Sequence, residues 1–345
     1  MKISKNKNTG LIALGEIMMR LNCLAGKRFT DPGSFDVLFG GAEANVCALL
    51  SGLGTSSRLI SCLPENELGL AAIAQLRGLG VDTSGIIFGK GRMGLYFTEN
   101  GHMLRSSKVI YDRKDSAFFN LERGKIDWAT ALQNAGWFHW SGITPALSAN
   151  TAAVCMDAIG TANQMGIPVS ADLNFRSSLW DYGTHPSSVI PEMISCSDLV
   201  VGDLHAASVY FGITNNSEAS VEDQFKSCAE AMKARFGSLQ AIAFSFRNSD
   251  DRHMENYRGA IYYENDYYFS PCHFLPMVID RIGSGDAFTA GLIHSIWNGY
   301  NPQLMIDFAT ACGILKHSVY GDFARFSQKE VNQFMKQGPG NRVIR

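Results

Sequence analysis

Apolar residues recur along the chain in two patterns, short continuous runs and longer stripes with helical spacing. The short runs predict strands over residues 11–17, 34–39, 58–63, 137–140, 169–173, 199–201, 241–246, 260–263 and 267–270. The stripes predict helices over about 42–53, 68–79, 151–165, 189–195, 221–236, 303–317 and 328–335. Because strands and helices alternate, we expect an α/β fold, with a mainly parallel sheet between two layers of helices.

One segment departs from this alternation. Residues 94–99 and 108–111 are strand-like with no helix between them, and Asn100-Gly101 predicts a tight hairpin turn that joins them. Such an antiparallel pair indicates a small sheet that projects from the main body as a lid. We therefore predict one α/β domain over residues 1–345, with a lid sheet inserted from about 15–40 and 92–114.

The composition restricts the kind of protein. A chain of 345 residues with 46% hydrophobic and 18% charged content can bury a large core. The net charge of -2 and the pI of about 6.4 argue against nucleic acid as a partner. The eight cysteines form no C-x-x-C pair, and Gly15-Glu16 interrupts the first apolar run. We therefore expect a cytoplasmic protein without disulfides, a zinc site, a signal peptide or a membrane span.

The strongest chemical signal lies between residues 277 and 298. The apolar run Met277–Ile279 predicts a buried strand, the turn Gly283-Ser284-Gly285-Asp286 follows, and a helical stripe then continues to Gly299. The first turn of a helix has unpartnered N–H groups and attracts anions. A carboxylate there would repel phosphate unless it accepts a proton from a group that attacks the phosphate. The alternative is that Asp286 only caps the helix.

A second glycine turn, Gly40-Gly41, precedes a predicted helix that carries Asn45. Glycine lets a polar ligand approach the backbone closely, and the Asn45 amide offers both a donor and an acceptor. Alternatively, the turn is tight for packing reasons and Asn45 is structural. A third glycine set, Gly89, Gly91 and Gly94, has the spacing of a dinucleotide-binding motif, but a hairpin follows it where that motif requires a helix.

The two glycine turns resemble the signatures of the ribokinase (PfkB) family of carbohydrate kinases. The first signature is similar to Gly40-Gly41-Ala42-Glu43-Ala44-Asn45, and the second to Asp280 followed by Gly283-Ser284-Gly285-Asp286. Within the family, the chain looks most like the 2-keto-3-deoxygluconate kinases. The stretches that carry this likeness include GEIMMRL, SKVIYDR, FHWSGITPAL and DLNFRSSLW. The resemblance covers essentially the whole chain and implies a ribokinase-like fold.

The resemblance also implies roles for individual residues. Asp286 would deprotonate a sugar hydroxyl, and the Gly283, Ser284 and Gly285 turn would stabilise the transferred phosphoryl group. Arg113 and Arg176 would face a sugar carboxylate, although each arginine alone could equally be a surface charge. The sugar-binding residues would be Gly40, Gly41, Asn45, Tyr96, Tyr111, Arg113, Ile143 and Arg176. The ATP-binding residues would be Asp203, Ser245, Arg247, Gly283, Gly285 and Thr310.

The chain departs from the family pattern at two points. Relatives have Asn-x-x-Glu, associated with magnesium, where this chain has Asp203-Leu204-His205-Ala206. Arg281 replaces a Thr or Ser near a monovalent-cation site, which leaves a monovalent-cation requirement open. No protein residue is predicted to ligate a metal directly, since His205 has no second ligand at a suitable spacing. Mg²⁺ would be held mostly by phosphates and water.

These observations predict an ATP-dependent kinase that phosphorylates a hydroxyl of a sugar acid, with 2-keto-3-deoxygluconate as the expected substrate. One alternative is a kinase for a neutral ketose such as fructose, or for a nucleoside. Another is a sugar-binding paralogue without turnover, which the altered Asp203 region favours and the intact Asp286 opposes. The open edges of a lid sheet further predict a homodimer or higher homo-oligomer formed through the lid.

Overall fold

The large sheet is built from the apolar runs of the sequence. The structure is a computed structural model, and it describes residues 10–101, 105–249 and 255–337. The strand order is β13-β12-β11-β10-β9-β8-β1-β4-β5, and the pairs from β11 to β5 are parallel. β12 and β13 add antiparallel strands at one edge, and β14 pairs with β12. The strands are β1 (Leu11–Leu14), β4 (Ser57–Pro64), β5 (Ile86–Gly89), β8 (Trp137–Ser141), β9 (Val169–Asp172), β10 (Leu199–Gly202), β11 (Ala241–Ser249), β12 (Glu255–Tyr263), β13 (Asp266–Phe269) and β14 (His273–Leu275).

Helices cover both faces of this sheet, because consecutive strand residues point to opposite sides. Leu11 and Ala13 of β1 belong to one hydrophobic core, whereas Ile12 and Leu14 belong to the other. The first core contains residues of α1 (Ala42–Gly52), α2 (Glu67–Gly78), α9 (Ser284–Trp297), α10 (Pro302–Lys316) and α11 (Gln328–Gln337). The second contains residues of α3 (Trp128–Ala131), α4 (Ile143–Leu147), α5 (Ala149–Gln164), α6 (Ile190–Ser195), α7 (Leu204–Phe211) and α8 (Val221–Arg235). The predicted α/β architecture is therefore confirmed.

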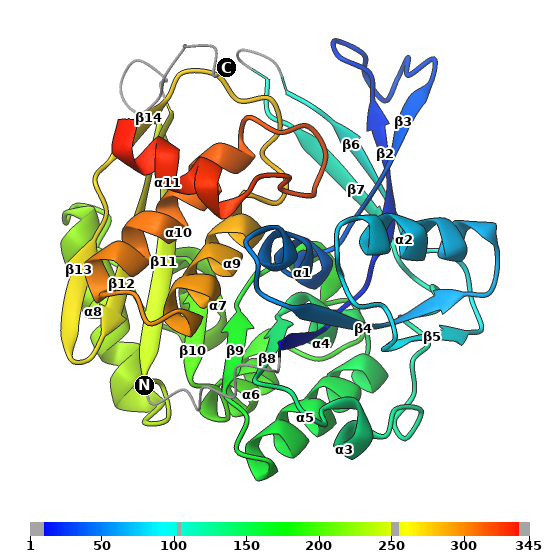
Figure 1. Cartoon of the computed structure of the whole chain (residues 1–345), viewed down its shortest axis with the longest axis horizontal. Helices are drawn as coiled ribbons and strands as arrows, with labels where there is room; N and C mark the ends of the chain where they lie inside the picture. The colour runs from blue at the N-terminus through cyan, green and yellow to red at the C-terminus, as the bar shows by residue number, and fades with distance from the viewer. Residues whose placement is uncertain (1–9, 102–104, 250–254, 338–345) are drawn as a thin grey trace.

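A separate four-stranded sheet projects from the upper right of the main body in Figure 1 and forms the lid. Its strands, in the order β3-β2-β6-β7, are β2 (Met18–Cys23), β3 (Phe35–Gly40), β6 (Leu95–Glu99) and β7 (Lys108–Asp112). The lid exposes Val37, Val109 and Ile110. β6 and β7 pair antiparallel, as predicted. Their connection spans 100–107, so Asn100-Gly101 forms only its beginning. Residues 102–104 of that connection lie outside the described part.

The segment before the glycine turn differs from the prediction of a buried strand. Met277 is 78% exposed and Ile279 is 50% exposed, and neither belongs to a strand. The backbone N–H of Ile279 instead donates to the carbonyl of His317, at 2.8 Å. Three apolar residues alone do not specify a strand, because a strand also needs a neighbouring strand with free backbone groups. Among the described helices, none combines the length and the apolar composition needed to cross a membrane.

A buried ionic cluster joins the lid to the main body. Arg20 of β2 is fully buried, and its guanidinium lies 2.8 Å from Asp280 and 3.0 Å from Asp322. It also donates to Thr98 of β6 at 2.9 Å and to Asn22 at 2.9 Å. Asp280 precedes the glycine turn, and Asp322 follows α10. One side chain therefore holds three distant segments together.

Arg20→Leu is expected to destabilise the fold strongly, because it leaves two buried carboxylates without their guanidinium partner. Loss of one partner from a buried ion pair costs about 3–5 kcal/mol of the free energy of unfolding. Urea unfolding followed by circular dichroism measures this loss. Arg58→Leu is the matched control, since Arg58 pairs with Asp82 at 2.6 Å but both side chains are more than a third exposed. That change should cost at most about 1 kcal/mol, and equal losses in the two variants would contradict the role of Arg20.

Candidate active site

A cavity of about 520 Å³ lies where the lid meets the carboxyl ends of the parallel strands. The parallel strands that reach it are β9, β10 and β11, through Asp172, Gly202 and Ser245. All of the predicted site residues except Gly40 and Thr310 line this cavity: Gly41, Asn45, Tyr96, Tyr111, Arg113, Ile143, Arg176, Asp203, Ser245, Arg247, Gly283, Ser284, Gly285 and Asp286.

Gly40 and Thr310 lie outside the cavity wall, which differs from their predicted contacts with sugar and ATP. A side-chain carbon added to Gly40 would come within 2.3 Å of the Asp322 carboxylate, so this glycine makes room for the ionic cluster. Thr310 is fully buried on α10, and its hydroxyl faces Gly259 of β12. Both positions therefore support the cavity wall from behind.

The turn before α9 presents an open anion site, which we call the anion loop (residues 283–286). Gly283 has a φ of 86°, and a side chain there would meet the Asp322 carbonyl oxygen at 2.4 Å. No side chain caps the first turn of α9, and the space beside Gly285 is empty. The uncapped amides face the cavity and suit an anion.

Asp286 lies in the first turn of α9, and only 8% of it is exposed. The Asn45 amide donates to its carboxylate at 2.6 Å, so the two predicted glycine-turn motifs meet directly. Burial raises the pKa of Asp286 to about 8, and the charges of Asp172 and Glu43 add to this effect, while the Asn45 hydrogen bond opposes it. The arrangement is that of a carboxylate able to accept a proton near neutral pH.

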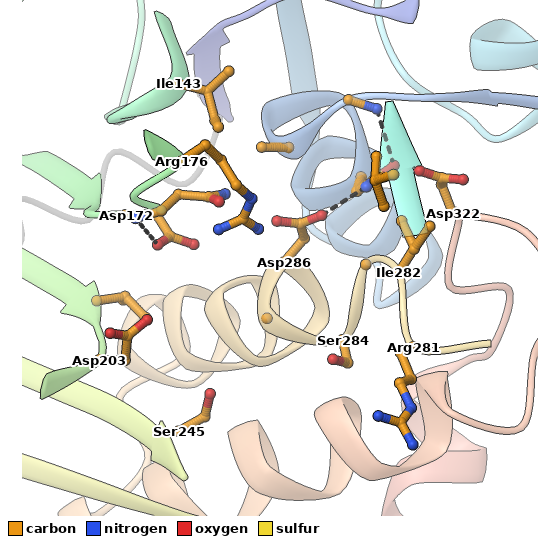
Figure 2. A pocket seen from close by; sticks show the side chains of 18 of the residues that line it. Ile143, Asp172, Arg176, Asp203, Ser245, Arg281, Ile282, Ser284, Asp286 and Asp322 are labelled. Carbon is orange, nitrogen blue, oxygen red and sulfur yellow. Dashed lines mark hydrogen bonds between the residues drawn. The ribbon is translucent and has the colours of Figure 1, made fainter. Parts of the chain in front are cut away.

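Asp172, at the end of β9, is an acid that the sequence did not single out as a site residue. Burial raises its pKa to about 7, and the nearby Arg176 opposes this effect. Its carboxylate accepts from the backbone N–H of Asn174 at 3.1 Å and from the Thr289 hydroxyl at 3.3 Å. Thr289 belongs to α9, so this contact ties the strand end to the helix that carries Asp286. Figure 2 shows Asp172, Arg176 and Asp286 around the same space.

The two arginines predicted to bind a carboxylate have different surroundings. Arg113 is 4% exposed, and its Nε lies 2.6 Å from the Glu16 carboxylate. Arg176 is exposed, donates to the Phe175 carbonyl at 2.8 Å, and has no ion pair among the described residues. Glu16, a residue that the sequence did not identify as part of the site, therefore balances the charge of Arg113. Arg176 has no such direct ion pair among the described residues, although Asp172 and Asp286 lie close enough to act on its pKa.

Two tyrosines of the lid line one side of the cavity. Tyr96 is 3% exposed and its hydroxyl donates to Asp322, and its ring centroid is 6.1 Å from that of Tyr111. Asp322 also binds Arg20. The sequence did not indicate it as a site residue, because its role depends on residues distant in the chain. The stretch Gly321-Asp322-Phe323 is part of the likeness to the 2-keto-3-deoxygluconate kinases, but the sequence indicates no role for its carboxylate.

The opposite arm of the cavity is lined by Ser245, Arg247, Tyr257 and Arg281. The hydroxyl of Tyr257 has no hydrogen-bond partner among the described residues. Asp203 also lines the cavity, but its carboxylate accepts from the backbone N–H of Ala206 at 2.8 Å and caps α7. Within the described residues, no group of three His, Cys, Asp or Glu side chains is placed to hold a metal ion.

Asp286→Asn is expected to stabilise the protein at alkaline pH. The folded-state pKa of about 8 exceeds the ordinary value of 3.8, so the folded protein loses stability as pH rises through this window. An amide avoids the ionisation and keeps the acceptor for Asn45. The gain in the free energy of unfolding should be about 2–4 kcal/mol at pH 8 and vanish near pH 4.

Urea unfolding at several pH values measures this difference. Asp307→Asn is the matched control, because Asp307 also accepts a side-chain amide, from Gln303 at 3.0 Å, but is only half-buried and lies outside the cavity wall. Burial raises the pKa of Asp307 as well, while Gln303 and His273 oppose this, so its Asn variant should show the same trend with a smaller gain. If Asp286→Asn changed the free energy of unfolding by the same amount at every pH, burial would not raise the pKa of the Asp286 carboxylate.

Known proteins resemble this chain along nearly its whole length. Residues 8–245 match the model of the pfkB family carbohydrate kinases. The 2-dehydro-3-deoxygalactonokinase of Haloferax volcanii is 29% identical, and the match covers 95% of this chain and 97% of that protein. The crystal structure of 2-dehydro-3-deoxygluconokinase from Thermotoga maritima is 34% identical, with a TM-score of 0.90 over 95% of this chain and 99% of that one.

A crystal structure of a putative 2-keto-3-deoxygluconate kinase from Enterococcus faecalis is 25% identical, with a TM-score of 0.89 over 98% of this chain and 99% of that one. These matches confirm the ribokinase-like fold that the resemblance implied. The match to the family model spans more than half of the chain, and the Asn45–Asp286 contact joins the two signatures. The chain belongs to the pfkB family of carbohydrate kinases.

Proposed function

We propose that this carbohydrate kinase transfers the γ-phosphoryl group of ATP to a hydroxyl of a 2-keto-3-deoxy sugar acid, such as 2-keto-3-deoxygluconate, in the cytoplasm. The observation that carries the substrate class is the unpaired guanidinium of Arg176, which lines the cavity beside Asp286. Several relatives are named as kinases of 2-dehydro-3-deoxy sugar acids, which supports the same class.

An unpaired cation in a partly desolvated cavity favours an anionic ligand. Desolvation lowers the pKa of Arg176, but Tyr111, Asp172 and Asp286 outweigh it and raise the pKa, so the guanidinium stays charged. A sugar carboxylate suits the planar guanidinium fork. Arg113 can also reach this ligand with its terminal nitrogens, but its charge is already balanced by Glu16. Discrimination between a sugar acid and a neutral sugar therefore depends on Arg176.

For catalysis, Asp286 accepts the proton of the attacking hydroxyl as that oxygen bonds to phosphorus and the bond to ADP breaks. The amides of the anion loop balance the charge on the transferred group. Asn45 orients the Asp286 carboxylate by its hydrogen bond of 2.6 Å. Tyr96 and Tyr111 cover the sugar from the lid side, and Gly41 and Ile143 line the space next to it.

ATP fits the second arm of the cavity, because the uncapped amides of α9 and the cationic Arg247 and Arg281 face it. Mg²⁺ would be carried by phosphate oxygens and water, with Asp203 nearby, and it screens phosphate charge when bound. A second copy of the chain is proposed to cover the exposed lid residues Val37, Val109 and Ile110.

ATP turnover with a panel of keto-deoxy sugar acids, neutral ketoses and nucleosides tests the substrate class. Arg176→Ala should raise the KM for 2-keto-3-deoxygluconate by about 10- to 100-fold, as expected for a lost charged hydrogen bond, and leave the KM for fructose nearly unchanged. Arg123→Ala, on the surface, is the control. If fructose or a nucleoside is the better substrate of the parent enzyme, the sugar-acid assignment fails; no turnover with any sugar would indicate a binding paralogue.

Asp286→Asn should bind ATP and sugar but lower kcat by about 10²–10⁴ or more, because it removes the proton acceptor. For the parent enzyme, kcat/KM should rise with pH, with an apparent pKa far above 3.8, since only the ionised carboxylate accepts a proton. Steady-state rates between pH 5 and 9, together with calorimetric binding, measure both effects. Asp307→Asn should match the parent, and a kcat of Asp286→Asn within a few-fold of the parent would exclude the assignment.

A further inference from the structure

Lys316 is a charged side chain that neither family signature contains. It lies in the last turn of α10, is fully buried, and donates from Nζ to the Val319 carbonyl at 3.0 Å. Its Cε would be 3.3 Å from a side-chain carbon added to Gly283, so the lysine packs directly behind the anion loop. A buried ammonium is costly unless nearby negative charge balances it.

The negative charge comes from the carboxylates of the ionic cluster. Burial lowers the pKa of Lys316, and Asp280 and Asp322 act in the opposite direction, so these two carboxylates favour the charged ammonium. Arg20, Lys316, Asp280 and Asp322 are all nearly or fully buried. Burial lowers the pKa of Lys316 and raises that of Asp322, so both groups depend on their oppositely charged neighbours to stay ionised; when ionised, the four side chains carry two positive and two negative charges. The region behind the anion loop is therefore electrically balanced by the protein itself.

The carboxylate oxygens of this cluster are already occupied by donors. Asp280 accepts from the backbone N–H groups of Ile282 at 3.1 Å and Gly321 at 3.2 Å, and from Arg20. Asp322 accepts from Arg20 and from the Tyr96 hydroxyl. A monovalent cation, which the family resemblance implies near this region, needs oxygen atoms that are free of donors.

The residues present do not fit such a cation. Any cation beside Asp280 would also be repelled by Arg20 and Lys316. These contacts, rather than the absence of an ion, are what argue against a cation site.

We propose that Lys316 is a positioning residue whose ammonium is the built-in counter-ion behind the anion loop, so that the enzyme needs no monovalent cation there. The fixed charge balances the nearby Asp280 and Asp322 electrostatically, and the packing of the lysine side chain behind Gly283 keeps the loop amides directed at the phosphate. It also adds positive potential near the transferred group. The proposal rests on the proposed kinase function.

Two variants separate charge from packing. Lys316→Met keeps most of the aliphatic volume but removes the charge. Lys316→Ala removes the charge as well, and it frees the Val319 carbonyl oxygen and opens the space of the lysine for a small cation. Lys233→Ala is the matched control, because Lys233 also donates to backbone carbonyls from the last turn of a helix, α8, but lies outside the cavity wall. The measurements are calorimetric affinity for a non-hydrolysable ATP analogue with Mg²⁺, and turnover with the best sugar from the substrate panel. Each is made in potassium, ammonium, sodium and tetramethylammonium chloride at equal ionic strength.

The parent enzyme should turn over equally well in the four salts. Lys316→Met should lose about 10- to 100-fold in kcat/KM for ATP, the size expected for a lost charged interaction, and no salt should restore it. Lys316→Ala should lose as much but recover in potassium or ammonium and not in tetramethylammonium. A several-fold stimulation of the parent by potassium would overturn the proposal. So would a Lys316→Met variant as active as the parent, or a loss in Lys316→Ala that none of the salts restores.

This test is independent of the sugar assignment. If the panel identifies a neutral ketose, the sugar-acid proposal fails, but the role of Lys316 is still measured with that ketose. If no sugar is phosphorylated, affinity for the ATP analogue still reports on the loop. Equal affinity in the parent and Lys316→Met would then overturn the proposal.

Discussion

The buried ion pairs of Arg20 with Asp280 and Asp322 are the interaction on which the site depends most. Arg20 belongs to the lid, Asp280 leads into the anion loop, and Asp322 follows α10. Charges buried this deeply are tolerated only when their hydrogen-bonding groups are matched. The cluster meets this condition by bringing the three segments to one place, and so it sets the distance between the lid and the phosphate site.

The protein interior around the ionic cluster has low polarity, so the loss of one charged partner there is costly. The same low polarity sets the pKa values of the acids around the cavity. Asp286, Asp172 and Glu43 are buried close together, and each has a raised pKa, mainly because of burial. Such a concentration of acids costs stability in the free enzyme, which is common where catalytic groups are preorganised. A carboxylate that resists ionisation is also a stronger proton acceptor once it is ionised.

The lid and the main body both contribute side chains to the cavity. The lid supplies Tyr96, Tyr111 and Arg113, while the strand ends supply Arg176 and Asp172. Because Glu16 follows β1 and binds Arg113, the main body also sets the charge of a lid residue. The sugar side of the cavity is therefore a product of both parts, and neither part alone determines its net charge.

The sequence by itself determined the alternation of strands and helices and the two glycine turns, because these depend on local periodicity and on backbone freedom. It also identified Asp286, Asn45 and Arg176, whose residue types and motif positions mark them. Only the tertiary structure decided that Asn45 bonds Asp286, that Glu16 neutralises Arg113, and that Met277–Ile279 is exposed. It also revealed Asp322 and Lys316 behind the anion loop. Charge balance and burial depend on residues hundreds of positions apart, and no local pattern encodes such pairings.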